Sequence, residues 1–347
     1  MRLGLDTYSL RWQGWTAFQL LGYAAGLGLD NVQFSERGAL DSLDHAYLRH
    51  LKQHAQQLGL SVEVGMLSFD RYSSCFRPDY GSGEQQLRDL IHAAHIVGSP
   101  IVRCVLGAQA DRLGPISFQQ HVDEFLRVLR EVAPLARDLG IKVAVENHGA
   151  VDFLARELRS CVETAGTDYV GVCLDTGNPA YAAEDPVAAT EILAPYIVAT
   201  QIRDTRIWSV EAGALAQWTP LGQGSVDMHR IRDILMEKAG GVAFNLETIT
   251  CSEPTLIPYA DPESDFWRAY PDMLARDFAR FLSRAEKAVS APLEQVTLQP
   301  GLHAPPSGPA GDELRQQQRR HFEESVIYAQ QILGLGEGSQ RPVLRGA

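Results

Sequence analysis

Four apolar runs between residues 143 and 247 each stop at a residue that can bind a metal ion. Three of them, in VAVENHG, VGVCLDTGN and FNLETIT, end at an acid, and the fourth, in VATQIRDTR, ends at an amide. The four residues are Glu146, Asp175, Gln201 and Glu247. Three carboxylates and one amide oxygen suit Mn²⁺ or Mg²⁺ better than Zn²⁺, with Co²⁺ as a further candidate. The sequence therefore predicts one divalent metal ion held by these four side chains.

Ligands so far apart in the chain can meet only if the fold brings their strand ends together. Residues 1–289 alternate short β-branched apolar runs with longer segments of helical periodicity, which is the pattern of βα units. Because the strand ends of a (β/α)8 TIM barrel converge on one pocket, we predict this α/β fold. A doubly wound open sheet is the rival, but no GxGxxG turn follows the first strand. The eight predicted strands are Arg2–Asp6, Asn31–Phe34, Ser61–Met66, Ile101–Leu106, Lys142–Glu146, Tyr169–Asp175, Ile197–Arg203 and Val242–Glu247.

Helical segments separate these strands. The predicted helices are Trp15–Leu27, Leu48–Leu58, Gln85–Val97, Phe118–Leu139, Leu154–Thr164, Val187–Leu193 and Met228–Ala239. The Gly-rich connection Asp204–Val226 is longer than a minimal barrel needs, which predicts a loop folded over the active face.

The carboxyl tail also exceeds a minimal barrel. A long helix is predicted near Asp265–Val289, followed by the Pro/Gly-rich stretch QPGLHAPPSGPAG and an amphipathic helix over Asp312–Leu333. We therefore assign residues 1–289 to the barrel and residues 290–347 to a linker with a C-terminal helical extension. That helix packs either on the barrel or against another chain.

Two side chains lie two residues beyond predicted ligands. His148 follows Glu146 at this spacing, so strand alternation would point both to the same side. It is a candidate general acid or base, and the alternative is that it only orients Glu146 or a substrate hydroxyl. Arg203 follows Gln201 at the same spacing, and its guanidinium could bind an oxyanion or a carboxylate.

Other candidate substrate contacts depend on loop and strand geometry. Asn178 could hydrogen-bond the substrate or cap a helix. Arg103 on the fourth strand faces the pocket unless the register slips by one residue, in which case Cys104 does. Trp208, with Trp218 and Trp12, could form an aromatic wall against a sugar ring or an aryl group, or belong to the core.

Composition excludes several classes of protein. The formal net charge is −12 and no Lys/Arg-rich run occurs, which disfavours nucleic acid as a ligand. The amino terminus lacks the pattern of a signal peptide, and no apolar stretch is long enough for a membrane span. A cytoplasmic protein without membrane contact is expected. The five cysteines are scattered without a CxxC pair, which is typical of buried free thiols.

The order of these motifs resembles that of the xylose-isomerase-like barrel superfamily, which includes sugar epimerases, hydroxypyruvate isomerase, inosose dehydratase and 3-dehydroshikimate dehydratase. The likeness covers residues 1–289 and is strongest where ENH, LDTGN, QIRDTR, LGQGSVD and LET follow one another. It implies metal ligands at Glu146, Asp175, Gln201 and Glu247. Many epimerases have His where this chain has Gln201, whereas hydroxypyruvate isomerase and several dehydratases resemble this chain in having Gln.

A hard cation at such a site polarises a carbonyl, acidifies the neighbouring proton and stabilises the enediolate that forms. We therefore predict a divalent-metal-dependent sugar isomerase or epimerase, with Glu247 or Glu146 as the base and His148 assisting. Loss of a leaving group from the same enediolate would instead make the protein a lyase. That alternative is an inosose- or dehydroshikimate-type dehydratase, or the α subunit of a C-glycoside deglycosidase acting on 3-oxo-glycosides.

The remaining expectations concern partners and rival classes. The substrate is expected to be a small sugar or polyol derivative. The chain is expected to form a homo-oligomer, or a hetero-oligomer in which the tail docks a small second subunit. The superfamily's endonuclease branch, which has His-rich multi-metal sites, is disfavoured by the scarcity of His at strand ends. A non-catalytic binding protein is disfavoured because all four ligand positions are filled.

Overall fold

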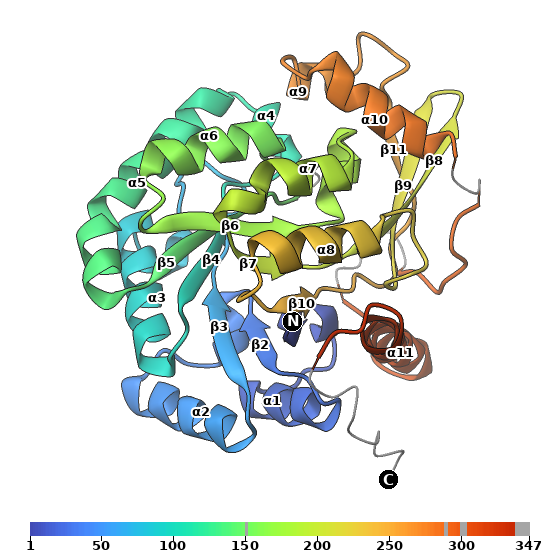
Figure 1. Cartoon of the computed structure of the whole chain (residues 1–347). Helices are drawn as coiled ribbons and strands as arrows, with labels where there is room; N and C mark the ends of the chain where they lie inside the picture. Colours follow the sequence, from blue (N-terminus) through green and yellow to red (C-terminus); the bar gives the residue numbers. More distant parts are fainter. Residues whose placement is uncertain (150–151, 288–290, 299–303, 337–347) are drawn as a thin grey trace.

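The computed structural model describes residues 1–149, 152–287, 291–298 and 304–336. Eight parallel strands form one sheet in the order β10-β1-β2-β3-β4-β5-β6-β7, which curves into a barrel (Figure 1). The strands are β1 (Leu3–Asp6), β2 (Asn31–Phe34), β3 (Ser61–Gly65), β4 (Ile101–Val105), β5 (Lys142–Glu146), β6 (Val170–Asp175), β7 (Ile197–Gln201) and β10 (Phe244–Leu246). A bridge between Ile202 and Leu246 joins the two ends of the sheet. The predicted TIM barrel is confirmed, and every predicted strand overlaps an observed one.

Helices surround the barrel between successive strands (Figure 1). They are α1 (Ala17–Gly26), α2 (His45–Gln57), α3 (Gly83–Val97), α5 (Phe118–Leu139), α6 (Ala155–Ala165), α7 (Pro186–Leu193) and α8 (Met228–Lys238). Short elements lie in the connections: η1 (Thr7–Leu10), η2 (Arg37–Leu40), η3 (Pro78–Tyr80), α4 (Gln109–Arg112), η4 (Asn178–Ala182) and η5 (Ala194–Tyr196). Gly98 and Gly140 end α3 and α5 in the left-handed conformation, at φ +88° and +66°, which glycine adopts without steric cost. Among the described residues, no helix combines the length and apolar character that a membrane span requires.

The connection after β7 is not the loop that the sequence predicted. It is an antiparallel hairpin of β8 (Asp204–Val210) and β9 (Gly213–Thr219), to which β11 (Thr255–Ile257) adds a third strand. Side chains of β8 and β9 alternate between the two faces of this small sheet, so neither strand is a continuous apolar run. The glycines of this connection supported the loop interpretation, but Gly213 only follows the tight turn between the two strands.

The long helix predicted at Asp265–Val289 is instead two helices, α9 (Asp265–Ala269) and α10 (Ala275–Ala285). Pro271 lies between them and disfavours helical conformation at the residue before it. The last two residues of the predicted helix lie outside the described ranges. Phe281 of α10 is buried in a second apolar cluster with Ile207 and Ala216 of the hairpin.

The C-terminal helix α11 (Pro309–Gln331) packs on the barrel, where it lies between α8 and α1 in the ring of helices (Figure 1). Phe322 and Val326 belong to the main core cluster, together with strand residues. Tyr23 of α1 donates a hydrogen bond to Glu323 at 2.7 Å, and Arg232 of α8 donates one to the Leu333 carbonyl at 3.2 Å. The helix therefore fills the place of the barrel's eighth helix. The predicted boundary between residues 289 and 290 falls outside the described residues.

Candidate active site

The four predicted ligand residues meet at the carboxyl end of the barrel. Glu146, Asp175 and Gln201 are the last residues of β5, β6 and β7, and Glu247 directly follows β10. Asp175 and Gln201 are register partners on neighbouring strands. All four are buried, and one oxygen from each of the three carboxylates lies within 4.8 Å of the others. This buried acidic triad could bind a metal ion.

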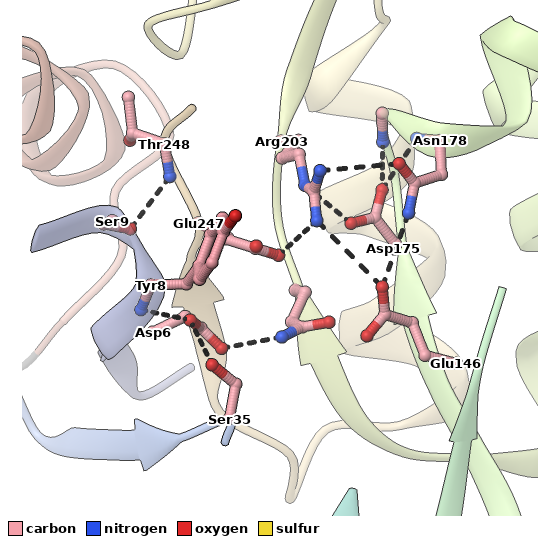
Figure 2. A network of polar contacts seen from close by, with 12 residues as sticks. Asp6, Tyr8, Ser9, Ser35, Glu146, Asp175, Asn178, Arg203, Glu247 and Thr248 are labelled. Atoms are coloured by element: carbon pink, nitrogen blue, oxygen red, sulfur yellow. Dashed lines mark hydrogen bonds and ion pairs between the residues drawn. The ribbon is translucent and has the colours of Figure 1, made fainter. Parts of the chain in front are cut away.

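Two arginines share the site with the acids. Figure 2 shows Arg203 between Glu247 on one side and Asp175 and Glu146 on the other. Its Nη2 lies 2.6 Å from Glu247 Oε2, and its Nε lies 2.8 Å from Asp175 Oδ2. Arg103 of β4 donates from Nε to Glu146 Oε2 at 2.5 Å. Both arginines therefore compensate part of the negative charge.

The compensation is incomplete, because Asp6 at the end of β1 adds a fourth buried acid. Burial, together with the charge of Glu247, raises the pKa of Asp6 to about 7. Burial likewise raises the pKa of Asp175 to about 6, against the attraction of Arg203, and raises that of Glu146 well above its ordinary value. Buried charges without counter-charges are strongly unfavourable. Four acids with two arginines leave two negative charges, which one divalent cation would neutralise.

Two buried oxygens of the site accept no hydrogen bond. They are Gln201 Oε1 and Asp175 Oδ2, the second of which meets Arg203 only as an ion pair. The amide nitrogen of Gln201, Nε2, donates to Asp6 Oδ2 at 2.7 Å. Asp6 therefore fixes the orientation of the amide and leaves Gln201 Oε1 without a hydrogen bond. Asp175 Oδ1 accepts from the backbone nitrogens of Gly177 and Asn178, at 2.8 and 2.7 Å. An oriented amide oxygen that accepts no hydrogen bond, placed among carboxylates, is a donor that fits a hard divalent cation.

We expect Asp6→Ala to lower metal affinity by about 10- to 100-fold, as loss of a residue that orients a ligand commonly does. The substitution removes the acceptor that fixes the Gln201 amide. Competition with a chromophoric chelator would measure the affinity for Mn²⁺. Ser35→Ala is the matched control, because it removes a different hydrogen bond to Asp6, of 2.8 Å, and leaves Gln201 held. Equal affinities of the Asp6→Ala and unmodified proteins would rule out this orienting role.

His148 lies beyond the end of β5 yet still lines the cavity above the acids. Its Nδ1 lies 2.8 Å from the Gly107 carbonyl oxygen. Because a carbonyl only accepts, Nδ1 carries the proton and Nε2 is the free acceptor. Burial, reinforced by the charges of Arg103 and Arg203, lowers the pKa of His148 to about 3. At neutral pH the ring is uncharged and suited to accept a hydrogen bond from a hydroxyl.

Asn178 and Arg103 also reach the site. Asn178 Nδ2 donates to the Asn147 carbonyl at 2.9 Å and lies 3.4 Å from Glu146 Oε1, so this residue supports a ligand as well as lining the cavity. Arg103 lines the cavity, whereas Cys104 is buried in the main core, as the predicted register requires.

The cavity above the acids has a volume of about 460 Å³. Trp208 is not among its lining residues, contrary to the sequence prediction. It pairs with Leu215 across the hairpin, whereas Trp218 pairs with Thr205, and alternation places these two pairs on opposite faces of the small sheet. Trp218 and Trp12 do line the cavity.

Asp6 and Arg11 are among the residues of this region that the sequence interpretation missed. Asp6 ends an apolar strand, the same signal that identified the four ligands, and it could have been found in this way. Arg11 lines the cavity from the connection after β1 and has no signal of comparable strength in the sequence.

Comparisons with known proteins agree with this architecture. Residues 21–270 match the family model described as xylose isomerase-like TIM barrel. The 3-oxo-isoapionate decarboxylase of Pectobacterium atrosepticum is 26% identical over 211 residues, which cover 59% of this chain and 69% of that protein.

Solved structures share the fold. D-psicose 3-epimerase from Clostridium cellulolyticum H10 gives a TM-score of 0.60 at 14% identity, over 82% of this chain and 98% of that one. The IolI protein, whose structure has a zinc atom bound, gives 0.55 at 16% identity, over 84% of this chain and 100% of that one. At these identities the likeness concerns the fold alone. The family model, in contrast, matches most of the barrel. The chain therefore belongs to the xylose isomerase-like TIM barrel family.

Proposed function

We propose that the protein is a divalent-metal-dependent enzyme that removes a proton next to the carbonyl of a small sugar and returns it as a sugar isomerase or epimerase. The observation that carries this proposal is the buried oxygen Gln201 Oε1, which accepts no hydrogen bond, beside the acidic triad. Glu146, Asp175, Gln201 and Glu247 would hold the cation. When bound, the cation supplies Lewis-acid polarisation of the carbonyl and electrostatic stabilisation of the enediolate.

Glu247 is the base that the geometry favours. It lines the cavity, whereas Glu146 lies deeper and is engaged by Arg103 through Oε2. Arg203 holds Glu247 Oε2 at 2.6 Å and leaves the other oxygen free to take a proton. His148, neutral with Nε2 as acceptor, is suited to accept a hydrogen bond from a substrate hydroxyl and so to orient it.

A second candidate is a lyase that forms the same enediolate by loss of CO2 rather than of a proton. The relative at 26% identity is a decarboxylase of a 3-oxo acid, which favours this reaction over the dehydratases. Gln201, where many epimerases have His, is compatible with either outcome. The two candidates differ in their products, so one assay separates them.

We expect treatment with EDTA to remove the metal and abolish activity, and Mn²⁺, Mg²⁺ or Co²⁺ to restore it. Metal content is measured by mass spectrometry, and activity by NMR in D2O with D-psicose, D-tagatose and 3-oxo sugar acids. Deuterium at the carbon next to the carbonyl without release of CO2 supports the isomerase or epimerase, and release of CO2 supports the lyase. Circular dichroism controls for loss of fold. Undiminished turnover by folded, metal-free protein would overturn the proposal.

A further inference from the structure

Arg11 lines the cavity but forms no ion pair with the buried acids of the site, Asp6, Glu146, Asp175 and Glu247, which together are called the acidic centre. Arg11 follows η1 and is half-buried. Its Nη1 donates to the Tyr8 carbonyl at 3.1 Å, and its Cζ lies 4.4 Å and 4.2 Å from the ring centroids of Tyr8 and Trp12. Among the described residues it forms no ion pair, whereas Arg103 and Arg203 contact the acids of the site. Four of its five N–H donors therefore remain for a ligand.

The surroundings of Arg11 favour binding of an anion. Two aromatic rings restrict the guanidinium, so little conformational freedom is left to lose on binding. Burial lowers the pKa of Arg11, although Tyr8 and the charge of Glu247 act in the opposite direction. The side chain nevertheless stays charged at any physiological pH.

The C-terminal helix holds this part of the chain in place. Arg315 of α11 donates to the Trp12 carbonyl at 3.1 Å, and Gln318 Oε1 accepts from the Trp12 nitrogen at 3.3 Å. Gln13 Nε2 donates to the Arg315 carbonyl at 3.0 Å. With a further hydrogen bond from Gln13 Nε2 to Gln318 Oε1 at 3.0 Å, the residues directly after Arg11 are fixed by four hydrogen bonds to α11, which preorganises the guanidinium for binding.

Charge balance identifies the kind of anion. Arg103 and Arg203 are engaged by Glu146, Asp175 and Glu247 of the centre. The other charged residues that line the cavity are Arg11, Arg77 and Glu36, which leave one positive charge in excess. A single negative charge cancels it, and a carboxylate matches the fork of donors on a guanidinium. Trp218, also in the lining, has a buried Nε1 donor without an acceptor, which a ligand oxygen could supply.

We propose that the substrate is a small sugar acid, whose carboxylate binds Arg11 while its carbonyl end meets the acidic centre. This inference rests on the proposed function for the role of the centre. A sugar phosphate fits less well, since its second negative charge would have no counterpart.

The test compares three ligands that differ only at one end: D-glucuronate, D-glucose and D-glucose 6-phosphate. Titration calorimetry on the Mn²⁺-loaded full chain should show tightest binding for D-glucuronate. Arg11→Gln should weaken D-glucuronate binding about 10- to 100-fold, the usual range for a hydrogen-bonded charge, and change D-glucose binding less than about threefold. Arg11→Lys, which keeps the charge and loses the fork, should give an intermediate loss.

Arg49→Gln is the control, because Arg49 is an exposed arginine of α2 outside the cavity, and removing its charge should change affinity less than about threefold. The inference is overturned if D-glucuronate binds no better than D-glucose, if D-glucose 6-phosphate binds tighter, or if Arg11→Gln weakens all three ligands equally. Metal content is measured in parallel. A protein without metal that still selects D-glucuronate through Arg11 would retain this inference and lose the proposed function.

Discussion

Glu247→Gln should keep the barrel folded and lower turnover by about 10³-fold, within the range for loss of a general base. The amide has nearly the size of the carboxylate, so it still fills the space beside Arg203, but it cannot take a proton from the substrate. It also removes one negative charge from a centre whose charges are nearly balanced. Turnover is measured at saturating Mn²⁺, so that any weakened metal binding does not enter the result.

Glu184→Gln is the control for this substitution. Glu184 is also a buried glutamate, but it lies outside the cavity and accepts a hydrogen bond from the Ala155 nitrogen. Burial raises the pKa of Glu184 to about 8, so the side chain is largely protonated at neutral pH and the amide changes its charge little. We expect turnover within about threefold of the unmodified protein. A Glu247→Gln variant that turns over as fast as this control would transfer the role of base to another residue.

A chain that ends at Lys287 should fail to fold, because it lacks α11. The helix and the residues directly after it contribute Phe322, Val326, Ala329 and Leu333 to the main core cluster. Burial of each large apolar side chain is worth about 1.5–3 kcal/mol, and their sum is comparable to the ~5–15 kcal/mol that keeps a whole protein folded. Circular dichroism and urea denaturation would detect the loss. A truncated chain with a cooperative transition near that of the full protein would contradict this role of α11.

Point substitutions in the full chain measure how much single side chains of α11 contribute to the free energy of unfolding. Phe322→Ala should lower the free energy of unfolding by about 3–5 kcal/mol, since Phe322 is completely buried. Ile327 of the same helix is 50% exposed, and Ile327→Ala should change it by less than about 0.5 kcal/mol. Equal effects of the two substitutions would show that α11 does not pack as described. These variants also separate a structural role of the helix from the docking of a second subunit, which would involve exposed residues.

Local signals in the sequence were sufficient for the barrel and for the four ligand positions. An apolar run that ends at an oxygen donor needs only a few consecutive residues to be recognised, and Glu146, Asp175 and Gln201 each follow such a run. The same signal at Asp6 was present and unused. Parallel strands then bring these ends together as a consequence of the fold, which is why separated residues could be assigned to one site.

The sequence by itself thus determined the order of the strands, the residues at their ends and the chemistry that those residues can support. Only the tertiary structure decided which donors are engaged and which are free. Gln201 is oriented by Asp6, which lies 195 residues away in the chain, and no local pattern encodes that contact. Trp218 lines the cavity and Trp208 does not, because one step along a strand reverses the face on which a side chain lies. Arg11 differs from Arg203 only in its neighbours, and charge compensation depends on distances through space rather than along the chain.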